Sequence, residues 1–227
     1  MIKAIIFDLD DTLISEMQYI ESGYRHISEL LTDITHVDDN SIFSLLMDLF
    51  HDSPKNVFNR LFDKLNISYK EDNILKLVEI YRNHEPHIQF FDDVLPNLEL
   101  LKVKGIKTGI ITDGYISTQR NKLRILNANK YFDHIIVTQE LGRKYWKPHP
   151  RPFELMKDKL NIEFNEMVYV GDNPEKDFYI SCIYPIKTVR IDRENSIHRM
   201  NDYYYDIKEN LLIRNLNELL KTKCQLL

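Results

Sequence analysis

Acidic residues gather directly after the first apolar run of the chain. Residues 3–7 are predicted to form a buried strand, and the stretch DLDDT, residues 8–12, follows at once. Side chains alternate along an extended chain, so Asp8 and Asp10 should lie on the same side. Two carboxylates this close repel each other, and one stays protonated unless a cation neutralises them. A divalent ion such as Mg²⁺, which prefers oxygen ligands, would resolve the conflict, although an Asp-x-Asp pair can also be a solvated turn.

A second acidic stretch follows another short apolar run, residues 168–170. Asp172 stands where that run ends, so its carboxylate could complete the coordination of an ion. Asn173 is equally typical of a cap on the helix expected to begin at Pro174, but this alternative leaves Asp172 unexplained. Asp177 is predicted to lie a little over one turn further on, inside the same helix.

Two further segments could bind an anion. Thr112 and Asp113 follow the apolar run 107–111, and a hydroxyl beside backbone N–H groups at the start of a helix makes an anion cradle. Lys147 lies in a loop, where a lone lysine is usually a surface residue, and Lys144 is a rival for any role assigned to it. Taken singly, these signals are more typical of a turn or a surface than of a site.

The elements that must position these residues follow an alternating pattern. Short apolar or β-branched runs predict strands at 3–7, 107–111, 134–137, 168–170 and 187–191, with helical patterns between the later ones. Such alternation indicates an α/β fold, a Rossmann-like parallel sheet core with helices on both faces. These sheets bind ligands beyond the carboxyl ends of their strands. Because three of the four polar signals close a strand and Lys147 follows a fourth, we expect one cleft suited to phosphoryl transfer.

The segment of residues 15–86 follows a different pattern. Apolar residues in it recur with the i, i+3, i+4, i+7 spacing of helical faces, for example between Phe58 and Leu65. Ser53-Pro54 predicts a helix start, with serine as the N-cap residue and proline in the first turn. We therefore expect an inserted all-helical cap domain over residues 15–86, and an α/β core domain over residues 1–14 and 87–227.

Composition describes an ordinary globular protein. Hydrophobic residues make up 43% and charged residues 29% of the 227 residues, and the net charge is −5. This balance excludes the strongly basic footprint of a dedicated nucleic-acid binder. Apolar stretches are too short for a membrane helix or a signal peptide. Cys182 and Cys224 form no C-x-x-C pair. We expect a cytoplasmic monomer or homodimer that binds neither nucleic acid nor a membrane.

The polar segments together resemble the motifs of the haloacid dehalogenase (HAD) superfamily, in the same order and over essentially the whole chain. The matching residues are Asp8-x-Asp10-x-Thr12 for the first motif, Thr112 for the second, Lys147-Pro148 for the third and Gly171-Asp172-x-x-x-x-Asp177 for the fourth. The helical insertion resembles the small α-helical cap that the phosphatase branch carries after its first strand. The full set of motifs is specific, whereas any single member is not.

The resemblance implies a phosphatase that works through a covalent intermediate. Asp8 would attack phosphorus and form an aspartyl-phosphate, and Asp10 would act first as general acid and then as general base. Thr112, the N–H of Asp113 and Lys147 would bind the phosphate of a small-molecule ester. Lys147 would also offset charge on the nucleophile.

The resemblance also implies a Mg²⁺ cofactor. The carboxylates of Asp8 and Asp172 and the backbone carbonyl of Asp10 would be its protein ligands. Three further residues would support the ligands from behind: Asp177, Thr12 and Asn173.

Within the superfamily, the residues favour phosphate-ester hydrolysis. Dehalogenases lack an acid two residues after the nucleophile and use no metal, whereas Asp10 and Asp172 are both present here. Phosphomutases usually carry Gly-Val where this chain has Asp11-Thr12. We therefore expect hydrolysis of a phosphosugar or a nucleoside monophosphate. A phosphomutase and a catalytically silent regulatory module that binds phosphate esters are the alternatives.

Overall fold

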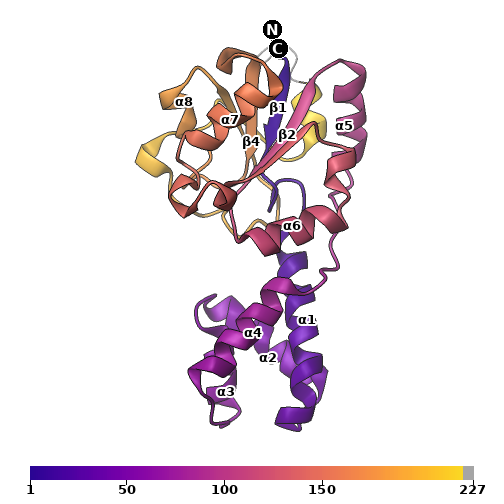
Figure 1. Ribbon diagram of the computed structural model, residues 1–227, viewed down its shortest axis with the longest axis vertical. Helices are drawn as coiled ribbons and strands as arrows, with labels where there is room; N and C mark the ends of the chain where they lie inside the picture. Colours follow the sequence, from indigo (N-terminus) through magenta and orange to yellow (C-terminus); the bar gives the residue numbers. More distant parts are fainter. Residues whose placement is uncertain (222–227) are drawn as a thin grey trace. The chain divides into compact units, whose positions relative to one another are not determined.

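A computed structural model describes residues 1–221 of the protein (Figure 1). It divides into a core unit, Met1–Met17 together with the chain from Ile88 onward, and a helical unit, Gln18–His87. The boundaries expected from the sequence, after residues 14 and 86, differ from these by a few residues. Cys182 is an exposed free cysteine, and Cys224 lies outside the described residues.

The core unit is built on a parallel sheet with the strand order β3-β2-β1-β4-β5-β6. Its strands are β1 (Ala4–Phe7), β2 (Lys107–Thr112), β3 (His134–Val137), β4 (Met167–Gly171), β5 (Lys187–Ile191) and β6 (Leu211–Ile213). The α/β class expected from the sequence is confirmed. The sequence pattern did not predict β6, because this strand has only three residues and follows a largely polar segment.

The strand β1 lies between β2 and β4, where the order of strand addition changes direction. Phe7 pairs with Ile110 of β2 and with Val170 of β4, so the chain leaves the three strands at nearly the same level. Open α/β sheets bind their ligands at such a switch point, beyond the carboxyl ends of the strands. The topology therefore brings the residues that follow Phe7, Thr112 and Gly171 to one edge of the sheet.

Helices cover both faces of the sheet. One face carries α5 (Val94–Val103), α6 (Ile116–Ile125) and α9 (Leu216–Lys221), and the other carries α7 (Arg151–Leu160) and α8 (Ile180–Ile183). Along β1, Ile5 and Phe7 belong to the first apolar core and Ala4 and Ile6 to the second, as alternation requires. Burial on both faces explains why the strands are continuous apolar runs in the sequence.

The helical unit is all-helical, as the expected fold class requires. The helix α1 (Glu16–Thr35) begins in the core unit and continues into the helical unit, which adds α2 (Asp39–Asp52), α3 (Val57–Lys64) and α4 (Glu71–Asn83). The rings of Tyr24, Phe58 and Tyr81 pack together with centroids between 5.5 and 6.1 Å apart. Within residues 1–221, no helix combines the length and apolar character needed to cross a membrane.

The helix start predicted at Ser53-Pro54 is wrong. Ser53 is the C-cap residue of α2, and its N–H donates to the carbonyl of Leu49 at 3.0 Å. The helix α3 begins only at Val57, after Asn56 in a left-handed conformation with φ 53°. Proline is as typical of the position just after a helix as of the first turn of the next one, so the pattern alone did not distinguish the two.

Truncating the core beneath the sheet should cost much of the stability. Phe153 of α7 is 0% exposed, and its ring packs edge-on against Tyr169 of β4 with centroids 4.9 Å apart. We expect Phe153→Ala to lower the free energy of unfolding by about 3–5 kcal/mol, measured by urea denaturation. Leu100→Ala, at a position 50% exposed on α5, is the control and should change it by less than about 0.5 kcal/mol. Equal effects of the two substitutions would contradict this assignment of the core.

Candidate active site

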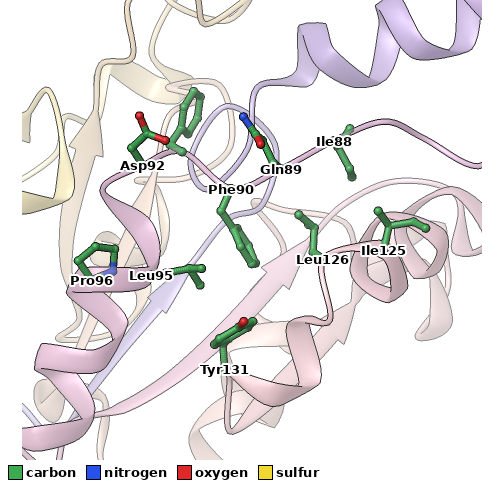
Figure 2. Close-up of a pocket in the computed structure, with 10 residues that line it drawn as sticks. Ile88, Gln89, Phe90, Asp92, Leu95, Pro96, Ile125, Leu126 and Tyr131 are labelled. Carbon is green, nitrogen blue, oxygen red and sulfur yellow. The ribbon is translucent and has the colours of Figure 1, made fainter.

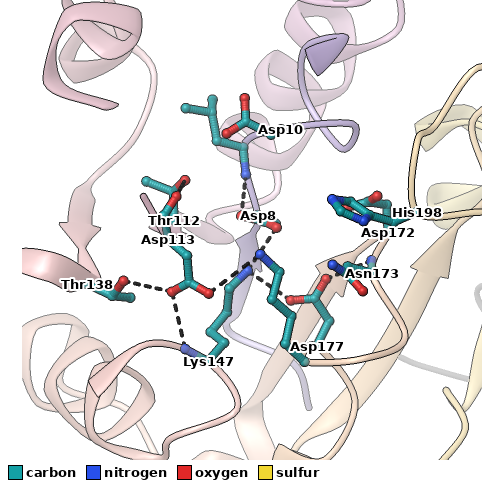
Figure 3. Close-up of polar contacts among 12 residues, drawn as sticks. Asp8, Asp10, Thr112, Asp113, Thr138, Lys147, Asp172, Asn173, Asp177 and His198 are labelled. Carbon is teal, nitrogen blue, oxygen red and sulfur yellow. Dashed lines mark hydrogen bonds and ion pairs between the residues drawn. The ribbon is translucent and has the colours of Figure 1, made fainter. Parts of the chain in front are cut away.

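Three aspartates form a buried cluster at the carboxyl edge of the sheet (Figure 3). Asp8 follows β1, Asp172 follows β4, and Asp177 lies in the segment after Asp172. Each offers a carboxylate oxygen, and these oxygens lie within 4.8 Å of one another. The N–H of Asp8 donates to the carbonyl of Val170 at 2.8 Å, continuing the pairing of β1 with β4. Sheet pairing therefore brings Asp8 and Asp172 together.

Gly171 makes room for the third carboxylate. A Cβ atom built on Gly171 would collide with the carboxylate of Asp177. The N–H of Asn173 donates to Asp177 Oδ2 at 2.9 Å and holds that carboxylate in place. Position 171 therefore requires glycine, because the carboxylate of Asp177 packs against the backbone there.

Lys147 lies at the centre of the cluster, with its side chain 0% exposed. Its Nζ is 2.8 Å from Asp8 Oδ2 and from Asp177 Oδ1 (Figure 3). The hydroxyl of Tyr169 is also 2.8 Å from this Nζ. Burial acts to lower the pKa of the ammonium, but the carboxylates of Asp177 and Asp8 outweigh burial and hold the pKa well above its ordinary value. Lys144, which the sequence offered as an alternative to Lys147, is exposed, and its Nζ lies 4.9 Å from the ring centroid of Tyr145.

The charge of Lys147 does not balance three carboxylates. Burial, together with the charges of Asp177 and Asp8, raises the pKa of Asp172 well above its ordinary value. The hydroxyl of Ser196 donates to Asp172 Oδ2 at 2.9 Å. Buried oxygen donors with an excess of negative charge fit a hard divalent cation, whose presence would keep Asp172 ionised.

The segment that the sequence predicts to bind an anion, Thr112 and Asp113, is joined to the loop that carries Lys147. Thr112 ends β2 and is buried, and the carboxylate of Asp113 follows it. Asp113 Oδ1 accepts hydrogen bonds from Thr138 Oγ1 at 2.7 Å and from the backbone N–H of Lys147 at 3.2 Å (Figure 3). Lys176 Nζ lies 3.5 Å from Asp113 Oδ2. Asp113 therefore fastens the loop that carries Lys147 to the end of β2.

Asp10 is neutralised by a partner that the sequence pattern did not reveal. Lys122 Nζ lies 2.6 Å from Asp10 Oδ1, and Gln119 Nε2 donates to Asp10 Oδ2 at 2.8 Å. Burial raises the pKa of Asp10, and the ammonium of Lys122 opposes that shift. Lys122 therefore offsets the charge of Asp10 and relieves the repulsion that the sequence predicts between Asp8 and Asp10. The carboxylates that lie close to Asp8 are those of Asp172 and Asp177.

Gln119 and Lys122 were missed because nothing in their immediate sequence marks them. Both lie on α6, three positions apart, so they share one face of the helix. Both are buried, at 1% and 3% exposed, although glutamine and lysine are mostly surface residues. One pattern in the sequence does point to them. They are polar residues three positions apart on the first helix after Thr112, so they share the helix face nearest the carboxyl end of β2.

The segment after Asp172 is a series of turns, so the helix predicted to begin at Pro174 is wrong. The helix α8 begins only at Ile180. The N–H groups of Lys176 and Asp177 both donate to the carbonyl of Asn173, and Asn173 Oδ1 accepts from the N–H of Glu175 at 3.0 Å. Asn173 thus caps a turn, and this turn directs the carboxylate of Asp177 inward toward Lys147.

Asp11 and Thr12 bind the loop after β1 to neighbouring segments of the core unit through hydrogen bonds. Asp11, at φ 51°, accepts hydrogen bonds from the N–H groups of Glu16 and Ile197, each at 2.9 Å. The carbonyl of Thr12 accepts from Arg193 Nη2 at 3.0 Å. The hydroxyl of Thr12 is buried and has no hydrogen-bond partner among residues 1–221. Both residues therefore hold the first loop against the segment that follows β5.

A separate cavity of about 530 Å³ opens elsewhere in the core unit (Figure 2). Its walls are mainly apolar and include Phe90, Leu95, Leu126 and Tyr131. The rings of Phe90 and Tyr131 meet edge-on with centroids 6.0 Å apart. None of the residues predicted to carry chemistry lines this cavity, so the acid cluster is the candidate active site.

The geometry and the sequence comparisons agree on the family. The family model for haloacid dehalogenase-like hydrolases matches residues 5–191. The chain therefore belongs to the haloacid dehalogenase-like hydrolase family, as the four motifs indicate.

Relatives in this family include proteins named as phosphatases. A glyceraldehyde 3-phosphate phosphatase from Methanocaldococcus jannaschii is 30% identical over 93% of this chain and 94% of its own length. The pyrophosphatase PpaX from Bacillus pumilus is 27% identical over 76% of this chain and 75% of its own. The crystal structure of a HAD phosphatase from Thermococcus onnurineus is 26% identical, covers 99% of both chains and superposes with a TM-score of 0.62.

Asp11 should make stability depend on pH. Burial raises the pKa of Asp11 to about 6 in the folded protein, against about 3.9 in an unfolded chain. The folded state therefore binds the proton more tightly, and its stability falls as pH rises from about 4 to about 6 and changes little above that. Asp11→Asn removes this titration, so between pH 4 and pH 7 its stability relative to the wild type should improve by about 2 kcal/mol, since an unfolded aspartate is already about half ionised at pH 4.

This prediction is checked by urea denaturation of both proteins at pH 4, 5, 6 and 7 in the presence of EDTA. Comparing the two proteins at each pH cancels the titration of groups that they share. A difference in the free energy of unfolding that stays constant over this range would show that Asp11 titrates normally.

Proposed function

We propose that the protein is a Mg²⁺-dependent phosphatase that hydrolyses small phosphate monoesters through an aspartyl-phosphate on Asp8. The observation that carries the proposal is the buried cluster in which Lys147 contacts Asp8 beside Asp172 and Asp177. Membership in a family of hydrolases and similarity to proteins named as phosphatases support the class of reaction.

Asp8 is suited to the role of nucleophile because both of its oxygens are held. The N–H of Leu9 donates to Asp8 Oδ1 at 2.8 Å, and Lys147 Nζ lies 2.8 Å from Oδ2. The ionised carboxylate is the form that attacks, and the ammonium beside it offsets its charge. Its orientation is fixed before the substrate arrives, so little ordering remains to be done in the reaction.

The proposed reaction has two steps. In the first, an oxygen of Asp8 bonds to phosphorus while the bond from phosphorus to the ester oxygen breaks, and protonated Asp10 gives its proton to the leaving alcohol. In the second, Asp10 takes a proton from water as that water attacks phosphorus. Inorganic phosphate leaves and the carboxylate of Asp8 is restored. Each step uses Asp10 once, first as acid and then as base.

The remaining motif residues bind and balance charge. The hydroxyl of Thr112 and the N–H of Asp113 would donate to phosphate oxygens, and Lys147 would offset their charge. Mg²⁺ would be held by the carboxylates of Asp8 and Asp172 and the backbone carbonyl of Asp10, and when bound it would neutralise charge on the phosphate. Three residues would support these groups: Asp177 through its ion pair with Lys147, Asn173 through its bond to Asp177, and Thr12 through Arg193.

The proposed substrate class is a small phosphosugar. The relative that matches 93% of this chain is named for glyceraldehyde 3-phosphate, a phosphorylated three-carbon sugar. A panel of phosphosugars, nucleoside monophosphates and pyrophosphate, assayed for released phosphate, tests this choice. Preference for a nucleoside monophosphate or pyrophosphate would change the substrate and leave the reaction class as proposed.

Removing the nucleophile should abolish turnover. We expect Asp8→Asn to lower kcat for p-nitrophenyl phosphate by at least about 10³-fold, because the amide cannot form the covalent intermediate. Asp158→Asn is the matched control, since the Asp158 side chain is 65% exposed on α7 and should be dispensable. Retention of more than a tenth of the wild-type rate in Asp8→Asn would refute the proposed nucleophile.

Mg²⁺ should stabilise the protein as well as activate it. At a concentration 100 times the Kd, a ligand that binds only the folded state adds about 2.7 kcal/mol to the free energy of unfolding. We expect a corresponding rise in Tm for the wild type and none for Asp172→Asn. Mg²⁺ binds the ionised carboxylate and the pKa of Asp172 is raised, so the affinity for Mg²⁺ should weaken as pH falls. An identical rise in Tm for the wild type and Asp172→Asn would show that Mg²⁺ binds at a site that does not include Asp172.

The phosphate-release assays also distinguish a phosphatase from the two alternative functions, a phosphomutase and a catalytically silent binding module. A phosphomutase would transfer the phosphoryl group to a second hydroxyl of a sugar without releasing phosphate. A silent module would bind phosphate esters tightly and turn over none of the panel.

A further inference from the structure

The carboxylate of Asp10 is held at both oxygens by side chains from α6. Oδ1 lies 2.6 Å from Lys122 Nζ, and Oδ2 accepts from Gln119 Nε2 at 2.8 Å. The side chain of Lys122 is 4% exposed and that of Asp10 is 19% exposed. An ion pair on the surface of the same helix, Arg120 with Glu140, is equally short at 2.6 Å but is 43% and 36% exposed. Burial therefore distinguishes the pair at Asp10 from an ordinary surface ion pair.

Gln119 connects Asp10 to the proposed phosphate-binding loop. Its Nε2 also lies 2.5 Å from Thr112 Oγ1 and 2.9 Å from the carbonyl oxygen of Asp113. One amide nitrogen thus contacts oxygens from the leaving-group side and from the phosphate side of the proposed site. Gln119 therefore bridges the carboxylate of Asp10 and the hydroxyl of Thr112.

Gly114 provides the space that Gln119 occupies. A Cβ atom at Gly114 would lie 3.0 Å from Gln119 Cγ, closer than neighbouring side chains comfortably pack, and its φ of 135° is one that other residues rarely adopt. The loop after β2 is therefore shaped around Gln119. Because Gln119 and Lys122 lie on one helix face, the orientation of α6 fixes both contacts to Asp10 at once.

We propose that Gln119 and Lys122 are positioning residues that hold the carboxyl of Asp10 where it meets the leaving-group oxygen of a substrate bound at Thr112. This inference rests on the proposed function, since it assigns these residues to the first step of that reaction. Without them, the short side chain of Asp10 would be free to change rotamer, and its average distance from the ester oxygen would increase. A misplacement of about 1 Å can cost up to about 100-fold in rate.

The proposal predicts an effect that depends on the leaving group. An alkoxide from a sugar phosphate leaves poorly unless it receives a proton, whereas p-nitrophenolate is a weak base and leaves without one. The value of kcat/KM reports the first step, in which the leaving group departs. A residue that positions the acid should therefore matter for sugar phosphates and matter little for p-nitrophenyl phosphate.

The test compares kcat/KM for both substrates in matched variants. We expect Lys122→Met to lower kcat/KM for a sugar phosphate by about 10- to 100-fold and that for p-nitrophenyl phosphate by less than about 3-fold. Gln119→Leu should lower both values, because Gln119 also contacts Thr112, and should lower the value for the sugar phosphate about 10-fold further. Asp10→Asn should show the same selectivity as Lys122→Met with a larger fall, and Lys122→Arg should recover part of the loss. Arg120→Met, which removes a charge from the exposed face of α6, should change neither value.

Two results would overturn the inference. Equal falls for the two substrates in both Lys122→Met and Gln119→Leu would indicate a role in folding only, and unchanged values would indicate no role. Either result, with Asp8-dependent turnover intact in the wild type, leaves the proposed function standing. A wild type without Asp8-dependent turnover would instead refute the proposed function and the inference with it. If Lys122→Met does not fold, Gln119→Leu and Lys122→Arg still decide the question.

Discussion

The ammonium of Lys147 lies buried between the carboxylates of Asp8 and Asp177, 2.8 Å from each. Buried carboxylates this close cannot all be ionised without compensating charge, and a buried charge that loses its partner is strongly destabilising. The loop that carries Lys147 must therefore reach the ends of β1 and β4. Its backbone is tied to β2 through Asp113, so one ion-pair network joins the ends of three neighbouring strands.

The core unit thus handles its acidic residues in two ways. Asp8, Asp172 and Asp177 share Lys147 and keep an excess of negative charge, which suits a divalent cation. Asp10 is supplied with its own lysine, Lys122 of α6. In the proposed reaction Asp10 must carry a proton, and burial, which raises the pKa of Asp10, favours the protonated form against the opposing charge of Lys122.

The sequence predicted the parts of the site that sit directly after apolar runs. Asp8, Thr112 and Asp172 each close a strand, and the rule that parallel strands end at one edge was enough to bring them together. Gln119 and Lys122 were not predicted, because the sequence alone does not show which part of the fold a given helix face will contact. Asp177 was assigned to a helix because a proline precedes it, but its attraction to Lys147 and the turn at Asn173 decide its conformation. Tertiary contacts overrode local signals in both cases.

The central claim is that Asp8 carries the phosphoryl group during turnover. It can be tested by quenching the enzyme with acid in mid-reaction, reducing any acyl phosphate with borohydride and sequencing the peptides by mass spectrometry. Reduction of an aspartyl-phosphate yields homoserine, and the account predicts homoserine at position 8, dependent on substrate. Homoserine at another aspartate, or none while phosphate continues to be released, would contradict it.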